Sequence, residues 1–395
     1  CKTIRNSQER YRIRVIKTGL QETKAFTYYT LSVVYMDILK KVTISVLAGF
    51  MLTGCYSKFD LDVESEPVLC LNSIIIPGDS IRLQVTRTWE WRENDLLNYQ
   101  NVDVTDAEVS LYINGQLMEK MTPRTYYMVT SPINSSINFY KTTTGFIADY
   151  IPASGDEIRF EAKSEKYGEA TAEITIPYPV DIENVSIDVS NLVKRSDVYF
   201  ESYDMTLNML ARFSDPAPTT DYYRVSTYLD NKYWTDSGEE GFVDGWVSKL
   251  DVNHEPLFTE HISVLESIFS DESSYTIFSD RQISGKSYPL HIFIDNLRYN
   301  YYNPYDLSEF KDFDLVVELS RLSESYYKYV LSEWEANYGM SGILGSMGLS
   351  EPVYGASNVS TGAGVVAAVV PYRYRINVRQ LIEEELGKSL PAILQ

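Results

Sequence analysis

Three histidines are the residues that first suggest chemistry, because imidazole is the commonest metal ligand and acid–base group near neutral pH. His254 and His261 stand with Glu255 and Glu260 within eight residues, and His291 lies farther along. The seven-residue spacing of the first two is neither the i, i+4 pair of a helical metal site nor a known zinc signature. His291 alternates with apolar neighbours, as strand residues do. We expect no metal centre here, and a site made by the four clustered residues is the alternative.

Four carboxylates share one glycine-interrupted loop, the segment DSGEEGFVDG. Asp236, Glu239, Glu240 and Asp244 offer the oxygen ligands that calcium prefers. Their order differs from that of an EF-hand loop, and a solvated loop is the favoured interpretation in a chain with net charge −20. Calcium binding by this loop stays open.

Signatures of the common enzyme classes are missing from the sequence. It contains no Gly-x-Ser-x-Gly elbow, no P-loop and no dinucleotide-binding fingerprint. We therefore expect no catalytic residues, no cofactor and a protein that is not an enzyme.

Aromatic side chains give a stronger signal, since the chain has 32 tyrosines and five tryptophans. Flat rings with polar rims suit both sugar stacking and protein contacts. The candidate binding or interface residues are Trp89, Trp91, Trp234, Trp246, Tyr299, Tyr301, Tyr302 and Tyr305. Packing within a sheet is the alternative for each of them, because strands favour tyrosine.

One cysteine stands at the end of an apparent export signal. Leu52, Thr53, Gly54 and Cys55 follow two lysines and the apolar run 42–52. A charged start, a short apolar core and a small-residue exit predict a secretory signal, and the core is half the roughly 20 residues of a spanning helix. The tetrapeptide resembles the bacterial lipoprotein box, in which the cysteine thiol is diacylated and the chain is cut just before it. We expect Cys55 to be the lipidated residue.

That motif divides the N-terminal part of the chain. We expect residues 1–35 to be a non-native upstream extension, 36–54 the lipoprotein signal peptide and 55–66 a lipidated acidic tether. The first 54 residues hold nine basic and three acidic side chains, so their removal leaves a chain more acidic than the whole. Such a surface repels phosphate groups, which excludes nucleic acid as a partner.

Alternating hydrophobicity predicts strands over most of the remainder. In AEVSLYING, Ala107 to Ile113 alternate cleanly and Asn114-Gly115 supplies a two-residue hairpin turn. Strands of this kind, spaced by 8–15 residues, predict an immunoglobulin-like β-sandwich over 67–179. The Pro-Tyr-Pro sequence around Tyr178 closes that domain.

Residues 180–395 are predicted to form a larger β-rich C-terminal domain. One amphipathic helix begins after Ser323 and ends at Gly339, because Ser323 suits an N-cap and glycine ends helices. A Gly-rich stretch then leads to a buried strand at 365–370, and the charged tail predicts a short helix. The expected fold class is all-β and mainly antiparallel.

Several segments resemble a known family. After the lipobox and the acidic tether come PVLCLNSIIIPGDSIRLQVTRT and VTDAEVSLYING, and later EPVYGASNVSTGAGVVAAVV. Together they resemble the Bacteroidota outer-membrane lipoprotein family catalogued as domain of unknown function 4249. Asn358, Gly362 and Gly364 match its last turn, whereas Val365 and Val366 stand where an aromatic residue is common.

The resemblance implies a location and a partner. It implies a lipid-anchored protein of the outer membrane, at the cell surface in preference to the periplasmic face. Because members of the family are often encoded beside TonB-dependent outer-membrane transporters, it also implies a non-enzymatic accessory or binding partner of such a transporter. The alternatives are a lipoprotein that captures a glycan or peptide for the transporter, and an adhesin or fimbrial component.

Overall fold

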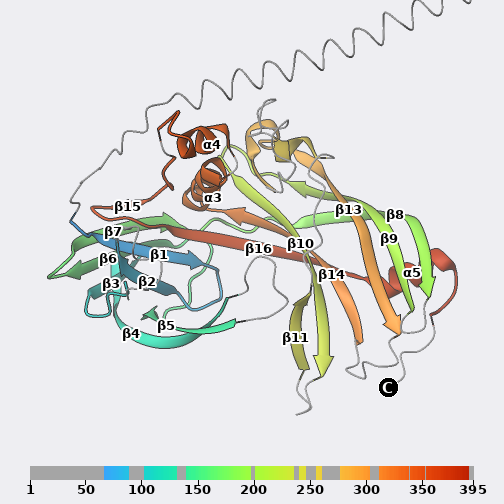
Figure 1. The fold of residues 1–395 in the computed structure, drawn as a ribbon, viewed down its shortest axis with the longest axis horizontal. Coiled ribbons are helices and arrows are strands. Elements are labelled where there is room, and N and C mark those ends of the chain that lie inside the picture. Colours follow the sequence, from blue (N-terminus) through green and yellow to red (C-terminus); the bar gives the residue numbers. More distant parts are fainter. Residues whose placement is uncertain are drawn as a thin grey trace, which may run out of the picture. The chain divides into compact units, whose positions relative to one another are not determined.

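The computed structural model describes ten ranges of the chain, and every structural statement below concerns those residues. The ranges are 66–88, 102–130, 139–196, 201–234, 240–245, 255–259, 276–302, 311–337, 339–351 and 353–390. They belong to one compact unit (Figure 1). Within them, no helix combines the length and the apolar character that a membrane span requires.

The described part of the chain is all-β with few helices, which confirms the predicted fold class. A 13-stranded sheet has the order β11-β10-β14-β16-β1-β2-β5-β4-β3-β6-β7-β15, and β12 pairs with β10. Its strands are β1 (Leu69–Ile75), β2 (Arg82–Arg87), β3 (Glu108–Ile113), β4 (Gln116–Thr130), β5 (Phe139–Ile147), β6 (Glu157–Ser164), β7 (Gly168–Thr175), β10 (Tyr222–Trp234), β11 (Glu240–Gly245), β12 (Ile277–Ser279), β14 (Lys311–Leu322), β15 (Val359–Ser360) and β16 (Val366–Asn377). A 3-stranded sheet joins β13 (Ser287–Tyr302), β9 (Glu201–Ser214) and β8 (Ile182–Ser196) in that order.

The first hydrophobic core lies on one face of the strands from β1 to β7. In β3, Val109, Leu111 and Ile113 are buried and alternate with polar residues, as the sequence predicts. Asn114 and Gly115 both have positive φ, 51° and 78°, and they turn the chain directly into β4. The predicted hairpin is therefore confirmed, because this pair adopts the left-handed conformation that a tight turn requires.

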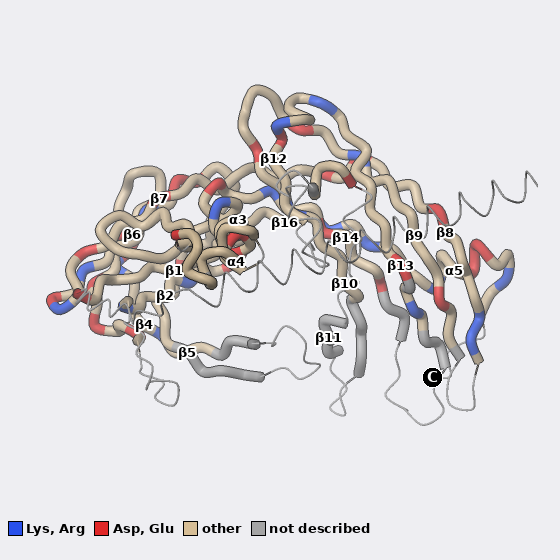
Figure 2. Tube along the Cα trace, turned by 45° about the horizontal axis from the view of Figure 1, so that its top comes forward, with Lys and Arg blue, Asp and Glu red and all other residues tan. Residues whose placement is uncertain are grey.

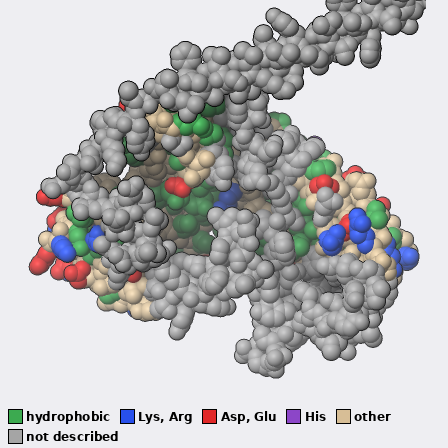
Figure 3. Space-filling model, viewed as in Figure 1, with side chains coloured by type: hydrophobic (Ala, Val, Ile, Leu, Met, Phe, Trp, Pro, Cys, Tyr) green, Lys and Arg blue, Asp and Glu red, His purple; other side chains and the backbone are tan. Residues whose placement is uncertain are grey.

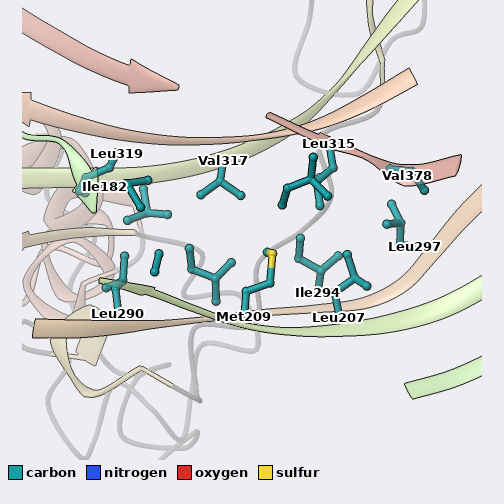
Figure 4. Packing of buried hydrophobic residues seen from close by; sticks show 14 of the residues in the cluster. Ile182, Leu207, Met209, Leu290, Ile294, Leu297, Leu315, Val317, Leu319 and Val378 are labelled. Carbon is teal, nitrogen blue, oxygen red and sulfur yellow. The ribbon is translucent and has the colours of Figure 1, made fainter. Parts of the chain in front are cut away.

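The second core lies between the 3-stranded sheet and strands β10, β14 and β16 of the long sheet. Figure 4 shows Met209 and Leu290 from the small sheet facing Val317 and Leu319 from β14. Side chains point alternately to the two faces of a strand, so apolar residues at every second position give each sheet one apolar face. Two sheets then pack with these apolar faces together.

Strand β16 connects the two cores. Its residues Val366, Ala368 and Val370 pack in the first core, whereas Tyr372 and Ile376, on the same face farther along, pack in the second. β16 also pairs with β1 in the parallel sense, while the other described strand pairings are antiparallel. The first and second halves of the described chain therefore share one strand, and the proposed division at 179–180 stays a prediction.

The α-helices of the described residues lie in the C-terminal part. They are α3 (Glu324–Asn337), α4 (Met340–Ser346) and α5 (Val378–Leu386), with short 3-10 helices η3 (Pro256–Thr259) and η4 (Asp280–Gln282). Ser323 caps α3 as predicted, because its Oγ accepts a hydrogen bond from the Tyr326 N–H at 3.3 Å. Within α3, Tyr327 and Trp334 are the buried residues. The sequence also predicts α5, but it does not predict α4, which lies in the Gly-rich stretch.

Candidate functional site

Most of the predicted aromatic contact residues are not described in full. Trp89, Trp91, Trp246 and Tyr305 lie outside the described residues, as do Leu52, Thr53, Gly54 and Cys55 of the lipobox. For Trp234, Tyr301 and Tyr302 the structure gives the backbone only: the first ends β10 and the other two end β13. In Figure 1 the arrowheads of β10 and β13, where Trp234 and Tyr302 end their strands, point to the same side.

Tyr299 corrects the sequence-based prediction. Its side chain is only 1% exposed and belongs to the second core, so it packs inside the protein and offers no surface for a partner. The Asn and Pro residues that follow Tyr299 favour a loop. The structure instead continues β13 to Tyr302, which turns this position inward.

Of the clustered histidines and glutamates, the structure describes Glu255 alone. His254, Glu260 and His261 lie outside the described residues. Glu255 is buried, and its carboxylate accepts hydrogen bonds from the Tyr288 hydroxyl at 2.8 Å and from the His291 backbone N–H at 2.7 Å. Glu255 therefore ties its segment to β13. In the acidic loop, Asp236 and Glu239 are outside the described residues, and Glu240 and Asp244 lie in β11.

An open cleft lies where the chain passes from the first core to the second. It has a volume of about 550 Å³, within the range of small-ligand sites. The cleft is lined by Tyr178, Pro179, Val180, Asp181, Glu183, Ser214, Pro216, Ala217, Thr219 and Arg321. An aromatic ring, two carboxylates and a guanidinium therefore meet in one concave surface, which we call the junction cleft.

Tyr178 is the exposed aromatic wall of the junction cleft. Its side chain is 64% exposed. A Cβ built on Gly155 would stand 2.6 Å from its hydroxyl oxygen, and the φ of Gly155 is +91°. The ring thus lies against a backbone position that only glycine fits without strain. The sequence predicts Tyr178 only as part of the segment that closes a domain. Its position between two prolines is the signal that could have identified it as a cleft residue.

Arg321 lines the junction cleft next to Tyr178. Its Nε donates to Oδ1 of Asp221 at 3.0 Å, and its Nη1 donates to the carbonyl oxygen of Tyr178 at 3.3 Å. A second nitrogen of the guanidinium also contacts Asp221. Because Arg321 is only 8% exposed, this charge-assisted pair is strong, and it holds the cleft wall to the start of β10.

Asp221, the partner of Arg321, belongs to a group of three buried aspartates. One carboxylate oxygen from each of Asp215, Asp221 and Asp280 lies within 4.8 Å of the others. Oxygen atoms so arranged are ligands that calcium or magnesium accepts. However, Asp215 already accepts from the Tyr223 hydroxyl at 2.5 Å and from the Gly285 N–H at 2.9 Å. We call this group, with Arg321, the aspartate cluster.

Protein donors also occupy the second carboxylate of the aspartate cluster. Oδ1 of Asp221 faces Arg321, and its Oδ2 accepts from the Thr219 hydroxyl at 2.8 Å. Of the three carboxylates, Asp221 is the one shown to pair with the Arg321 guanidinium. Burial raises the pKa of Asp280, and the charges of Asp215 and Asp221 raise it further. The arrangement is therefore an internal clamp that joins the β9–β10 connection, η4 and β14.

The fold and these sites define an all-β protein with two packed cores and a polar cleft at their junction. A family model described as Domain of unknown function (DUF4249) matches residues 56–375. The chain belongs to this family. A comparison with curated proteins gives no match.

Proposed function

We propose that the protein is a non-enzymatic lipoprotein of the outer membrane, of the kind found in Bacteroidota, and that it acts as an accessory or binding partner of a TonB-dependent transporter. The observation that carries the proposal is the position of Cys55. The cysteine ends a lipobox and precedes Leu69, the first residue of β1, by fourteen residues. The folded unit would then begin a short distance after a lipidated N-terminus.

The length of that connection supports a role at the membrane. Fourteen residues span about 50 Å at most when fully extended. A body held within that distance meets other membrane proteins at a high effective concentration, so even a weak interface is occupied. The preferred location is the cell surface, where the body reaches the outward-facing part of a transporter.

The described side chains support binding better than catalysis. Glu255, Asp215 and Asp221 each accept hydrogen bonds from protein donors, which commits them to structural roles. The junction cleft combines Tyr178 with Asp181 and Glu183, groups that suit recognition through stacking and hydrogen bonds. A nucleophile paired with a base is not found among the residues that line this cleft.

The test is localisation followed by capture of partners. We expect the wild-type chain in the outer-membrane fraction and the Cys55→Ala chain outside it. A C-terminal tag on the wild-type chain should co-purify a β-barrel transporter from a detergent extract, and protease treatment of intact cells should degrade the body. Recovery of the membrane-bound protein without any β-barrel partner contradicts the accessory role.

Capture of a glycan or peptide for the transporter is the second candidate, and the junction cleft favours it. An exposed tyrosine beside two carboxylates suits a sugar ring or a short peptide with a basic group. On arrays of glycans and peptides, Tyr178→Ala should lower binding about tenfold, since one good aromatic contact contributes about 1.4 kcal/mol or more. Tyr354→Ala is the matched control, because Tyr354 is 80% exposed and lies outside the cleft. A flat response of the folded wild-type chain removes this candidate.

A further inference from the structure

Three large apolar side chains project from the connection between α4 and β15. Met347 is 58% exposed, Leu349 is 60% exposed and Tyr354 is 80% exposed. Figure 3 shows hydrophobic side chains gathered over the region of α4. Single exposed apolar residues are common, but three within eight positions mark a contact surface. We call these three residues the apolar loop.

Hydrogen bonds hold the first part of the apolar loop in place. The Leu349 N–H donates to the Leu344 carbonyl at 2.8 Å, and the Gly348 N–H donates to the Gly345 carbonyl at 2.9 Å. The Ser350 hydroxyl donates to the Ser341 carbonyl at 2.9 Å. The backbone therefore folds back on α4, and the side chains of Met347 and Leu349 point to solvent without packing on a core.

The segment that carries the apolar loop has few charged residues of its own. Residues 339–355 contain one charged side chain, Glu351, although 23% of the whole chain is charged. Glu333 of α3 lies beside this segment, 3.6 Å from a Cβ built on Gly355. Figure 2 shows further charged residues near the ends of β6 and β7 and around α5. In a chain with net charge −20, this segment can enter an apolar phase with few of its own charges to desolvate.

The apolar loop also lies near the point where the chain from Cys55 enters the fold. Downstream of Tyr354, the Ala363 N–H donates to the Leu69 carbonyl at 2.9 Å, and the Leu71 N–H donates to the Ala363 carbonyl at 2.9 Å. Ala363 thus lies beside the first residues of β1. Nine residues separate it from Tyr354, which limits the separation to about 30 Å.

We propose that the apolar loop inserts into the interfacial region of a phospholipid bilayer and forms a second, non-covalent membrane contact beside the lipid anchor. The inference rests on the proposed function for its biological setting. Met347 and Leu349 would enter the acyl boundary, and Tyr354 would lie at the headgroup level, where tyrosine is favoured. Because anchor and loop enter the bilayer at separate points, the pair would fix which surface of the body faces outward.

The experiment measures partitioning onto vesicles without the acyl chains. The chain from residue 56 onward, which lacks the signal peptide and the acylated cysteine but keeps the whole compact unit, is mixed with phosphatidylcholine vesicles and floated through a density gradient. Adding Met347→Ser, Leu349→Ser and Tyr354→Ser should lower the partition coefficient at least about tenfold. Burial of a single Leu or Met side chain already favours the bound state by about tenfold or more. Leu117→Ser with Met118→Ser, at residues 53% and 46% exposed in β4, should leave it unchanged.

Three results overturn the inference. One is equal partitioning with and without the serine substitutions, and another is no partitioning of either chain. The third is a serine variant that keeps vesicle binding but no longer co-purifies a protein, which would assign the loop to a protein partner. Equal thermal midpoints verify that the variants fold. Mass analysis of the wild-type N-terminus separates the two proposals, because an unacylated Cys55 ends the proposed function without affecting the vesicle comparison.

Discussion

Arg321 and Asp221 form a buried ion pair across 100 positions of the sequence, with Nε of the arginine 3.0 Å from Oδ1 of the aspartate. The same guanidinium donates to the carbonyl oxygen of Tyr178. Tyr178 lies in the segment that connects the strands of the first core to those of the second. One side chain therefore links β14, the start of β10 and the wall of the junction cleft.

Loss of this arginine should strongly destabilise the fold. Arg321→Leu leaves Asp221 buried without its counter-charge, which costs about 3–5 kcal/mol in the free energy of unfolding. Urea denaturation measures that change. The control is Arg124→Leu, because the Arg124–Asp149 pair is 49% and 76% exposed at its two side chains and should contribute less than about 1 kcal/mol. Equal losses in the two variants contradict the role assigned to Arg321.

Asp280 should make the protein less stable as the pH rises. Burial raises the pKa of Asp280 above its unfolded value of about 3.9. A raised pKa means that its contribution to stability is complete below about pH 3.9 and is lost as the pH rises through the folded value. Asp280→Asn should therefore be more stable than wild type at pH 7, and the difference should vanish in acid.

Calcium provides an independent check on the aspartate cluster. As an internal clamp, the cluster should give the same thermal midpoint with calcium and with a chelator. A calcium-dependent rise that Asp280→Asn abolishes would show that the cluster is a cation site.

Asp204 should behave in the opposite way. The hydrogen bond from Arg298 lowers the pKa of Asp204, and Arg195 lowers it further despite burial. A lowered pKa adds stability above the unfolded value of about 3.9, and that stability is lost as the pH falls through the folded value. Asp204→Asn should be less stable than wild type at pH 7, by up to about 1 kcal/mol, since the arginines are largely exposed. Denaturation from pH 3 to 8 measures this, and a difference that grows in acid speaks against it.

Gly364 should be indispensable for the contact between β1 and β16. A Cβ at this position would stand 2.3 Å from the backbone carbonyl of Leu71, which cannot move without breaking the strand pairing. Gly115 also has a positive φ, but a Cβ there meets nothing within 4 Å. Both alanine substitutions carry the conformational cost, and Gly364→Ala should cost about 1–3 kcal/mol more through overpacking. Similar unfolding midpoints for the two variants refute this explanation.

Local features were predictable from the sequence because their causes are local. The alternation in β3, the turn at Asn114 and Gly115 and the cap at Ser323 each depend on a few neighbouring residues. The family-like turn also has a local cause. Asn358 accepts from the Val366 N–H at 2.9 Å and donates to the Val366 carbonyl at 2.8 Å, which fixes the start of β16.

Long-range features were not predictable because their partners lie far apart in the chain. Ser73 pairs with Val366 across the middle of the long sheet, and no hydrophobic period encodes that pairing. Asp215 and Asp280 of the aspartate cluster lie close together in a region where β10 pairs with β12, a pairing of distant segments. The prediction of Tyr299 as a contact residue is wrong because a second sheet, formed by distant segments of the chain, covers its face.

The most direct test of the account is the mass of the mature N-terminus. The protein purified from its membrane should yield an N-terminal peptide that begins at Cys55 and carries a diacylglycerol on the thiol. An unacylated chain that continues upstream of Cys55 would contradict the anchor and, with it, the proposed role at the outer membrane.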